Sequence, residues 1–166
     1  MCIAKNKIGI SLVAHYDVEN ESELLAMKPL SGAYAIINVT GRFLLGFNKW
    51  RQQWEFPAGK IEKGEKPVAA ARRELYEETH QQVLDLTLCG AFKIYDSTIQ
   101  EYRYRAVYYG VLDEIVPFVS CASDEMERVT LWDLHKDIGY VDEVDLKMVE
   151  LAVISNPRIG ISVKGS

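Results

Sequence analysis

The sequence predicts an α+β domain in which a mixed β-sheet lies between helices. Two patterns favour this class: segments of alternating hydrophobicity outnumber helix-like segments, and the two kinds do not alternate as regular β-α-β units. A third observation is size, because 166 residues with 48% hydrophobic content fit one core, and halving the chain would leave each half marginal. We therefore expect one domain over residues 1–166.

The N-terminal half is expected to supply three strands and one short helical or irregular piece. Residues 7–18 (KIGISLVAHYDV) alternate like a strand, and residues 21–27 (ESELLAM) form the short piece. Residues 34–39 (YAIINV) and 42–47 (RFLLGF) indicate a hairpin joined by a Thr-Gly turn.

The C-terminal half combines a central helix with further strands. A helix is expected over residues 67–79, because proline suits the first helical turn, where its missing N–H would have no partner anyway. Further strands are expected at residues 83–95, 102–112 and 129–132, and a closing helix of 3.6-residue apolar spacing at 143–154.

Composition excludes several classes of function. A net charge of −5 argues against a nucleic acid polymer or an anionic membrane as partner, although a local basic patch is still compatible with a small polyphosphate. Cys2, Cys89 and Cys121 are scattered without C-x-x-C spacing, which indicates neither a disulfide framework nor structural zinc. No apolar run approaches the ~18 residues of a membrane span and no secretory leader is evident, so we expect a cytoplasmic protein.

Three carboxylates crowd the end of the expected helix. At 100° per residue, Glu74, Glu77 and Glu78 cover an arc of roughly 100° beside the apolar stripe. That stripe consists of Val68, Ala71 and Leu75. Like charges at these spacings cost only about 0.2–0.5 kcal/mol each. The cluster alone is therefore compatible with a solvated helix face as well as with a cation site.

The surroundings of the cluster favour the cation site. Gly59 leaves room for close backbone approach and offers an unhindered carbonyl, Glu65 follows six residues later, and Arg73 directly precedes Glu74. Several hard oxygen ligands at one place are what Mg²⁺ or Mn²⁺ prefers.

The segment 59–81 resembles the signature of the Nudix hydrolases, G-x5-E-x7-R-E-U-x-E-E-x-G-U, in which U is aliphatic. The matching positions are Gly59, Glu65, Arg73, Glu74, Leu75, Glu77 and Glu78. Two positions depart from it: His80 replaces a glycine and Gln81 replaces an aliphatic residue. The glycine normally serves a left-handed helix end, so the departures bear on the helix exit and not on the carboxylates.

The resemblance implies an α/β/α sandwich with a mixed central sheet and a loop-helix-loop catalytic box. It also implies metal-dependent hydrolysis of a nucleoside diphosphate linked to another group, by attack of water at phosphorus. Glu74, Glu77 and Glu78 would be the metal ligands with the Gly59 carbonyl, and Mg²⁺, or alternatively Mn²⁺, would be the cofactor. The family's pattern also pairs Arg73 with Glu65 to orient these carboxylates. The implied general base is Glu78 or Glu125, with Asp124 and Glu127 as competitors in the same loop.

The substrate is expected to be a nucleotide-type small molecule. Arg42, Lys49, Arg51 and Lys60 are candidates for phosphate contacts, and Trp50, Trp54 and Tyr102 for stacking on a base. WEFPAGKIEKGE resembles the box entry of MutT-like nucleoside triphosphate pyrophosphohydrolases, whereas PAGK is also common in ADP-ribose pyrophosphatases.

We therefore expect a nucleoside triphosphate, an oxidised one such as 8-oxo-dGTP included, to be cleaved to monophosphate and pyrophosphate. The alternatives are an ADP-ribose or nucleotide-sugar pyrophosphatase and a nucleotide-binding regulatory module without hydrolysis. A homodimer is left open.

Overall fold

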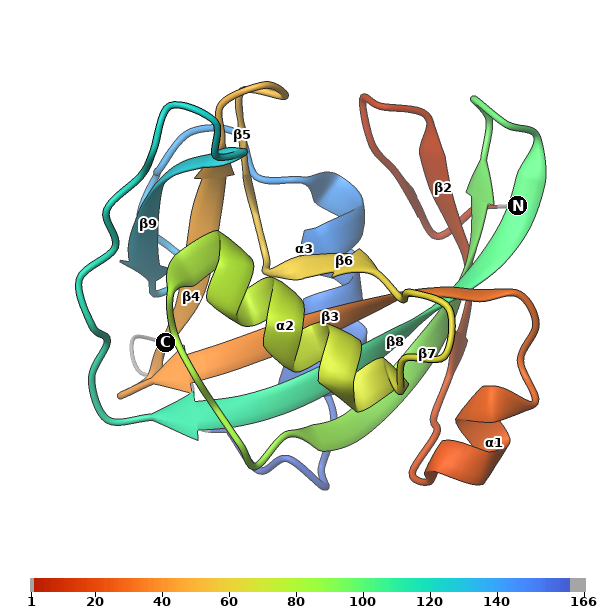
Figure 1. Cartoon of the computed structure of the whole chain (residues 1–166). Helices are drawn as coiled ribbons and strands as arrows, with labels where there is room; N and C mark the ends of the chain where they lie inside the picture. Colours follow the sequence, from red (N-terminus) through yellow and green to blue (C-terminus); the bar gives the residue numbers. More distant parts are fainter. Residues whose placement is uncertain (1, 162–166) are drawn as a thin grey trace.

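The computed structural model describes residues 2–161, which form a mixed sheet with helices on both faces (Figure 1). The elements are β1 Ala4–Lys5, β2 Ile10–Tyr16, α1 Glu21–Leu25, β3 Leu30–Val39, β4 Arg42–Asn48, β5 Gln53–Glu55, β6 Ala58–Lys60, α2 Pro67–Thr79, β7 Thr87–Asp96, β8 Glu101–Leu112, β9 Met126–Trp132, α3 Glu143–Val149 and the π-helix η1 Glu150–Ile154. The strand order is β1-β2-β7-β8-β3-β4-β5, with β6 paired to β3 and β9 to β4. β3 and β8 run parallel and the other named pairs antiparallel, so the predicted fold class is confirmed.

β3 explains why both faces of the sheet need a helix. Ala33 and Ala35 belong to a core cluster with Leu75 of α2, whereas Tyr34 and Ile36 belong to a second cluster on the α3 side. Successive side chains of a strand point to opposite faces, so a strand buried on both sides must be covered twice. Figure 1 shows α2 across one face and α3 behind the other.

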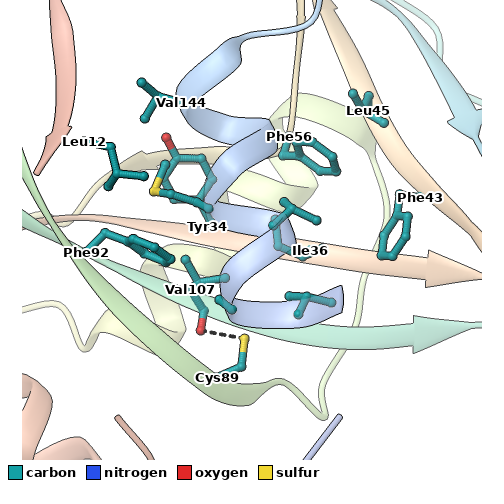
Figure 2. Packing of buried hydrophobic residues seen from close by; sticks show 14 of the residues in the cluster. Leu12, Tyr34, Ile36, Phe43, Leu45, Phe56, Cys89, Phe92, Val107 and Val144 are labelled. Carbon is teal, nitrogen blue, oxygen red and sulfur yellow. Dashed lines mark hydrogen bonds between the residues drawn. The ribbon is translucent and has the colours of Figure 1, made fainter. Parts of the chain in front are cut away.

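Aromatic side chains fill the layer between the sheet and α3 (Figure 2). Phe43 and Phe56 meet edge to face, with ring centroids 6.4 Å apart. Cys89 is fully buried there and its thiol donates to the Val107 carbonyl at 3.1 Å. Burial raises the pKa of the Cys89 thiol to about 12, so it stays protonated and behaves as a small packing residue.

Several element boundaries differ from those expected. Residues 83–86 precede β7 instead of opening it, because Val83 and Leu86 pack in the space left by Gly110, where a Cβ would lie 2.8 Å from either side chain. The closing helix turns from α to π at residue 150. Among residues 2–161, no helix is both long and apolar enough to cross a membrane.

Gln81 shows what its departure from the aliphatic pattern does. Its buried carboxamide donates to the Val116 carbonyl and accepts from the Val116 N–H, both at 2.8 Å. These two bonds fasten the segment between β8 and β9 to the end of α2. Glu125 lies at the far end of that segment.

His80 occupies the left-handed position that the family gives to glycine. Its φ is 64°, its N–H donates to the Tyr76 carbonyl, and its ring lies 4.7 Å from the ring of Phe118. The predicted left-handed helix end is therefore present. The imidazole adds a packing contact that a glycine would lack.

His80→Gly should change the free energy of unfolding by less than about 1 kcal/mol. Relief of the left-handed strain, about 1 kcal/mol, opposes the loss of ring packing, which is worth about 0.5–1.5 kcal/mol. Urea denaturation measures the balance, and turnover should stay within a few fold. A large loss of activity in a folded variant would assign the imidazole a chemical role.

Candidate active site

A cavity of about 610 Å³ opens beside β3, β6 and α2, and its lining includes five of the charged candidate residues: Arg51, Lys60, Glu74, Glu78 and Glu125. The acidic lining residues are Glu55, Glu74, Glu78, Asp96, Glu125, Asp142 and Asp145. The basic lining residues are Arg51, Lys60, Arg103 and Arg105. Carboxylates thus outnumber cations by seven to four. This excess of hard anionic oxygen favours a bound cation.

The register of α2 decides which of its carboxylates enter the cavity. Glu74 and Glu78 are four residues apart, so they share one helix face, and both line the cavity. Glu77 is not among the lining residues; its side chain is 55% exposed and accepts from Arg73 at 3.3 Å. Glu77 therefore lies on the neighbouring, solvent-facing side of the helix in this structure, and its role as a metal ligand stays a prediction.

Of the three glutamates of α2, Glu78 is the most buried, with 7% of the residue exposed. Its Oε1 accepts the N–H of Ala58 at 3.0 Å, which ties the end of α2 to β6. Burial raises the pKa of Glu78 well above its ordinary value, and the charges of Glu125 and Glu74 add to the rise. A positive charge in the cavity would offset both the burial of the Glu78 carboxylate and its repulsion from Glu125 and Glu74.

Gly59 makes room for the Glu74 carboxylate. A Cβ built on Gly59 would lie 2.1 Å from the carboxyl carbon of Glu74, far inside van der Waals contact. Burial also raises the pKa of Glu74, while its bond from Arg73 opposes the rise. The glycine of the motif thus allows a strand and the partly buried Glu74 carboxylate to touch.

Arg73 ties the helix to the loop and to β6. Its Nε and Nη2 donate to the two carboxylate oxygens of Glu65 at 2.8 and 3.0 Å, so the pair that the family's pattern implies is present. Nη1 donates to Glu74 at 2.7 Å, and Nη2 also reaches the Lys60 carbonyl at 2.8 Å. The bond from Arg73 lowers the pKa of Glu65. Arg73 therefore sets the position of Glu74.

The structure separates the three acidic residues around the start of β9. Glu125 lines the cavity and its Oε1 accepts from Asn48, with Arg51 3.8 Å away. Asp124 instead accepts from the Cys121 N–H, and Glu127 pairs with Arg128 on the surface. Only Glu125 of the three is brought to the site.

The candidate phosphate contacts are also separated. Arg51 and Lys60 line the cavity, and Arg51 donates to Glu55 at 3.0 Å. Arg42 is not brought there, because it pairs with Val39, at the opposite end of β3 from the cavity. Lys49 donates to the carbonyls of Cys121 and Ala122 instead.

The stacking candidates do not meet at the cavity. Trp54 is buried, and its indole N–H donates to the Ile138 carbonyl. Trp50 and Tyr102 are exposed, and neither lines the cavity.

Sequence reasoning missed a chain of polar groups on the α3 side of the cavity. Arg105 donates to the Tyr34 hydroxyl at 2.9 Å, which donates to Asp145 at 2.8 Å, and Asp145 also accepts the Phe56 N–H at 3.1 Å. One signal was available: Arg103 and Arg105 alternate within a strand, which places both on one face.

A second missed group joins the buried Glu55 and Asp142. Gln53 donates to both carboxylates, and Asn6 donates to Asp142 at 2.9 Å. Asp142 also caps α3 by accepting the N–H groups of Val144 and Asp145. These bonds hold the wall of the cavity that lies opposite α2.

The carboxylates of the cavity fit a divalent cation by their chemistry more than by their present arrangement. Across residues 2–161, no three His, Cys, Asp or Glu side chains stand close enough to form a ready-made metal cluster. Arg73 helps to keep these carboxylates apart, because it holds Glu74 and Glu77 by hydrogen bonds. Nevertheless, the buried Glu78 lines the same acidic cavity as Glu74 and Glu125, and their hard carboxylate oxygens are of the kind that suits Mg²⁺ or Mn²⁺.

Glu78 should make the metal-free protein less stable as the pH rises. Its folded pKa lies above the value of about 4.3 for an unfolded glutamate, so between the two pKa values the folded state binds more protons and stability falls with increasing pH. In EDTA, raising the pH from 4 to 7 should therefore destabilise the wild type relative to Glu78→Gln in urea denaturation. Parallel pH profiles for the two proteins would contradict this.

Comparison with known proteins adds a family and several relatives. The model of the NUDIX domain matches residues 28–151. An RNA pyrophosphohydrolase from Bartonella bacilliformis is 58% identical over 33 residues, which are 20% of this chain and 19% of that protein. Another RNA pyrophosphohydrolase, from Bartonella henselae, is 31% identical over 94 residues, 57% of this chain and 46% of that protein. The match therefore spans less than half the length of either relative.

A solved structure extends the likeness to the fold. The MutT NUDIX hydrolase from Burkholderia pseudomallei superposes with a TM-score of 0.62 at 24% identity, over 72% of this chain and 94% of that chain.

Proposed function

This chain belongs to the NUDIX domain family, and on that basis we propose that it is a metal-dependent pyrophosphohydrolase. It would hydrolyse a phosphoanhydride bond in a nucleoside diphosphate linked to another group. The observation that carries the proposal is the meeting of Glu74, Glu78 and Glu125 with Arg51 and Lys60 in one cavity. Such a cavity offers acidic oxygens for a cation and basic groups for the phosphates of a substrate.

The roles of the residues follow from their positions. A divalent cation held by Glu74 and Glu78 with the Gly59 carbonyl would neutralise phosphate charge and lower the pKa of a bound water. Arg73 keeps Glu74 in place, with Glu65 holding Arg73 from the other side. Glu77 would join the ligands only by leaving Arg73 and turning toward the cavity.

Glu125 is our choice for the general base over Glu78. Glu78 is buried and already accepts the Ala58 N–H, whereas the Glu125 side chain is 37% exposed and open to water. Asn48 holds one Glu125 oxygen by a hydrogen bond. The other oxygen can then take the proton of the attacking water.

The proposed substrate carries a 5′-triphosphate. The names of the relatives, RNA pyrophosphohydrolase and MutT NUDIX hydrolase, support cleavage within a phosphate chain. The name RNA pyrophosphohydrolase adds a second candidate substrate, a triphosphate at the end of an RNA, to the free nucleoside triphosphate expected from the sequence. The expectation that no nucleic acid polymer binds is tested by the same assay.

The decisive assay compares nucleotides in the presence of Mg²⁺. The panel contains dNTPs, 8-oxo-dGTP, a 5′-triphosphorylated oligoribonucleotide and ADP-ribose, scored for orthophosphate, pyrophosphate and monophosphate. We expect pyrophosphate release from a triphosphate to be faster than cleavage of ADP-ribose, and EDTA to abolish both. A hundredfold preference for ADP-ribose would replace our substrate by the nucleotide sugar. Binding without turnover of any of these would instead support a regulatory module.

A further inference from the structure

Two cations flank a glycine on the cavity side of the sheet. Gly32 of β3 pairs with Lys60 of β6 on one side and with Arg105 of β8 on the other. Residues paired directly across strands project to the same face, and each pair is about 5 Å wide, so the two basic stems stand about 10 Å apart. Gly32, the residue between them, adds no side chain of its own to that space.

The Arg105 side chain leans into this gap. A Cβ built on Gly32 would lie 3.6 Å from the Cγ of Arg105, so the arginine stem runs alongside the glycine. Lys60 and Arg105 both line the cavity. The side chain at position 59 would point to the opposite face, toward Glu74, because neighbouring residues of β6 alternate. The gap and the Glu74 site therefore lie on opposite faces of β6.

In the described part of the chain, neither cation forms an ion pair with a carboxylate. Within residues 2–161, Arg105 donates one hydrogen bond, to the Tyr34 hydroxyl, although a guanidinium has five N–H donors. Lys60 forms no ion pair in that part of the chain, although the same cavity contains seven acidic residues. Among the described residues no hydrogen bond joins Arg105 directly to Asp145, because Tyr34 lies between them. The charges of Asp145 and Asp142 act on the guanidinium without occupying its remaining donors. Unpaired cations that line a cavity attract an anion.

We propose that Lys60, Gly32 and Arg105 form a slot for a phosphate group of the substrate that is not itself attacked. Arg103 extends the slot, since it lies two residues along β8 on the same face and lines the same cavity. The identity of the ligand rests on the proposed hydrolysis, because that activity supplies a substrate with more than one phosphate. The slot would hold one phosphate, while the part of the cavity that contains Glu74 and Glu78 would position another.

Metal-free binding separates this slot from the carboxylate site. With EDTA present, a carboxylate site repels pyrophosphate, whereas the slot attracts it. In isothermal titration calorimetry of the full chain with pyrophosphate, Lys60→Met and Arg105→Met should each weaken binding about tenfold or more. Arg42→Met is the matched control, because Arg42 is exposed and lies outside the cavity, and its Kd should stay unchanged. Glu78→Gln should bind equally well or more tightly.

Three results would overturn the slot: no binding without metal, unchanged binding in the Lys60 variant, or equal weakening by Arg42→Met. Lys60 is exposed on a short strand, so its variant keeps the test valid if Arg105→Met does not fold.

Kinetics with Mg²⁺ identifies which phosphate occupies the slot. If the phosphate belongs to the triphosphate chain, Lys60→Met should raise KM about tenfold for a nucleoside triphosphate and for a 5′-triphosphorylated dinucleotide alike. If it is the phosphodiester of RNA, only the dinucleotide should respond. Either result supports the slot, and an unchanged KM for both overturns it while leaving the hydrolase intact. Slot-dependent binding in a protein that hydrolyses nothing would instead remove the proposed function alone.

Discussion

Replacing Glu78 with glutamine should lower kcat for the preferred triphosphate by about 100-fold or more while the fold survives. Glutamine keeps the shape of the side chain and an acceptor for the Ala58 N–H, so the change removes mainly the negative charge. Loss of one hard ligand weakens the binding of the cation, so less positive charge is available to stabilise the charge on the phosphate. A factor of 100 corresponds to about 2.7 kcal/mol of transition-state stabilisation. Steady-state kinetics over a Mg²⁺ series measures the loss.

Glu114→Gln is the matched control for this charge removal. Glu114 is exposed in the segment between β8 and β9 and does not line the cavity. Its variant should change stability by less than about 0.5 kcal/mol and leave kcat unchanged. If Glu78→Gln hydrolysed like the wild type at limiting Mg²⁺, the cavity would not be the cation site.

The motif predicted the local part of the site because helix geometry fixes it. Spacing of four residues puts Glu74 and Glu78 on one face of α2, and the Arg73–Glu65 pair, which the family's pattern implies, is local as well. Spacing did not reveal how far the helix is rotated about its axis. The structure buries Ala70 beside Ala71 and Leu75 and leaves Val68 only partly buried, and this rotation leaves Glu77 facing solvent.

The opposite wall of the cavity depends on contacts between distant parts of the chain. The Tyr34 hydroxyl meets Arg105, 71 residues away, and Asp145, 111 residues away. These contacts exist because β3 and β8 pair in parallel and α3 closes behind them, and no short motif encodes that arrangement. Arg42 illustrates the same limit: its charge suggested phosphate binding, but strand direction puts it at the wrong end of β3.

Gly59→Ala should lower kcat about 100-fold at little cost in stability. The added methyl would meet the Glu74 carboxylate at 2.1 Å, and the carboxylate is the movable end of a side chain, so Glu74 would swing away. The swing would break the 2.7 Å bond from Arg73 and remove Glu74 from the cation. Because the displaced group is flexible, we expect a loss of less than about 1 kcal/mol in urea denaturation.

A double-mutant cycle decides whether Glu74 transmits this effect. Without the Glu74 carboxylate nothing collides with the new methyl, so Gly59→Ala should lower kcat no further in a Glu74→Ala background. The two single variants and the double variant should then have similar kcat values. If the double variant were about 100-fold slower than Glu74→Ala, the methyl would be acting through β6 itself. Position 59 would then matter for the path of the backbone, and the close contact between glycine and carboxylate would not be the reason that the motif requires glycine.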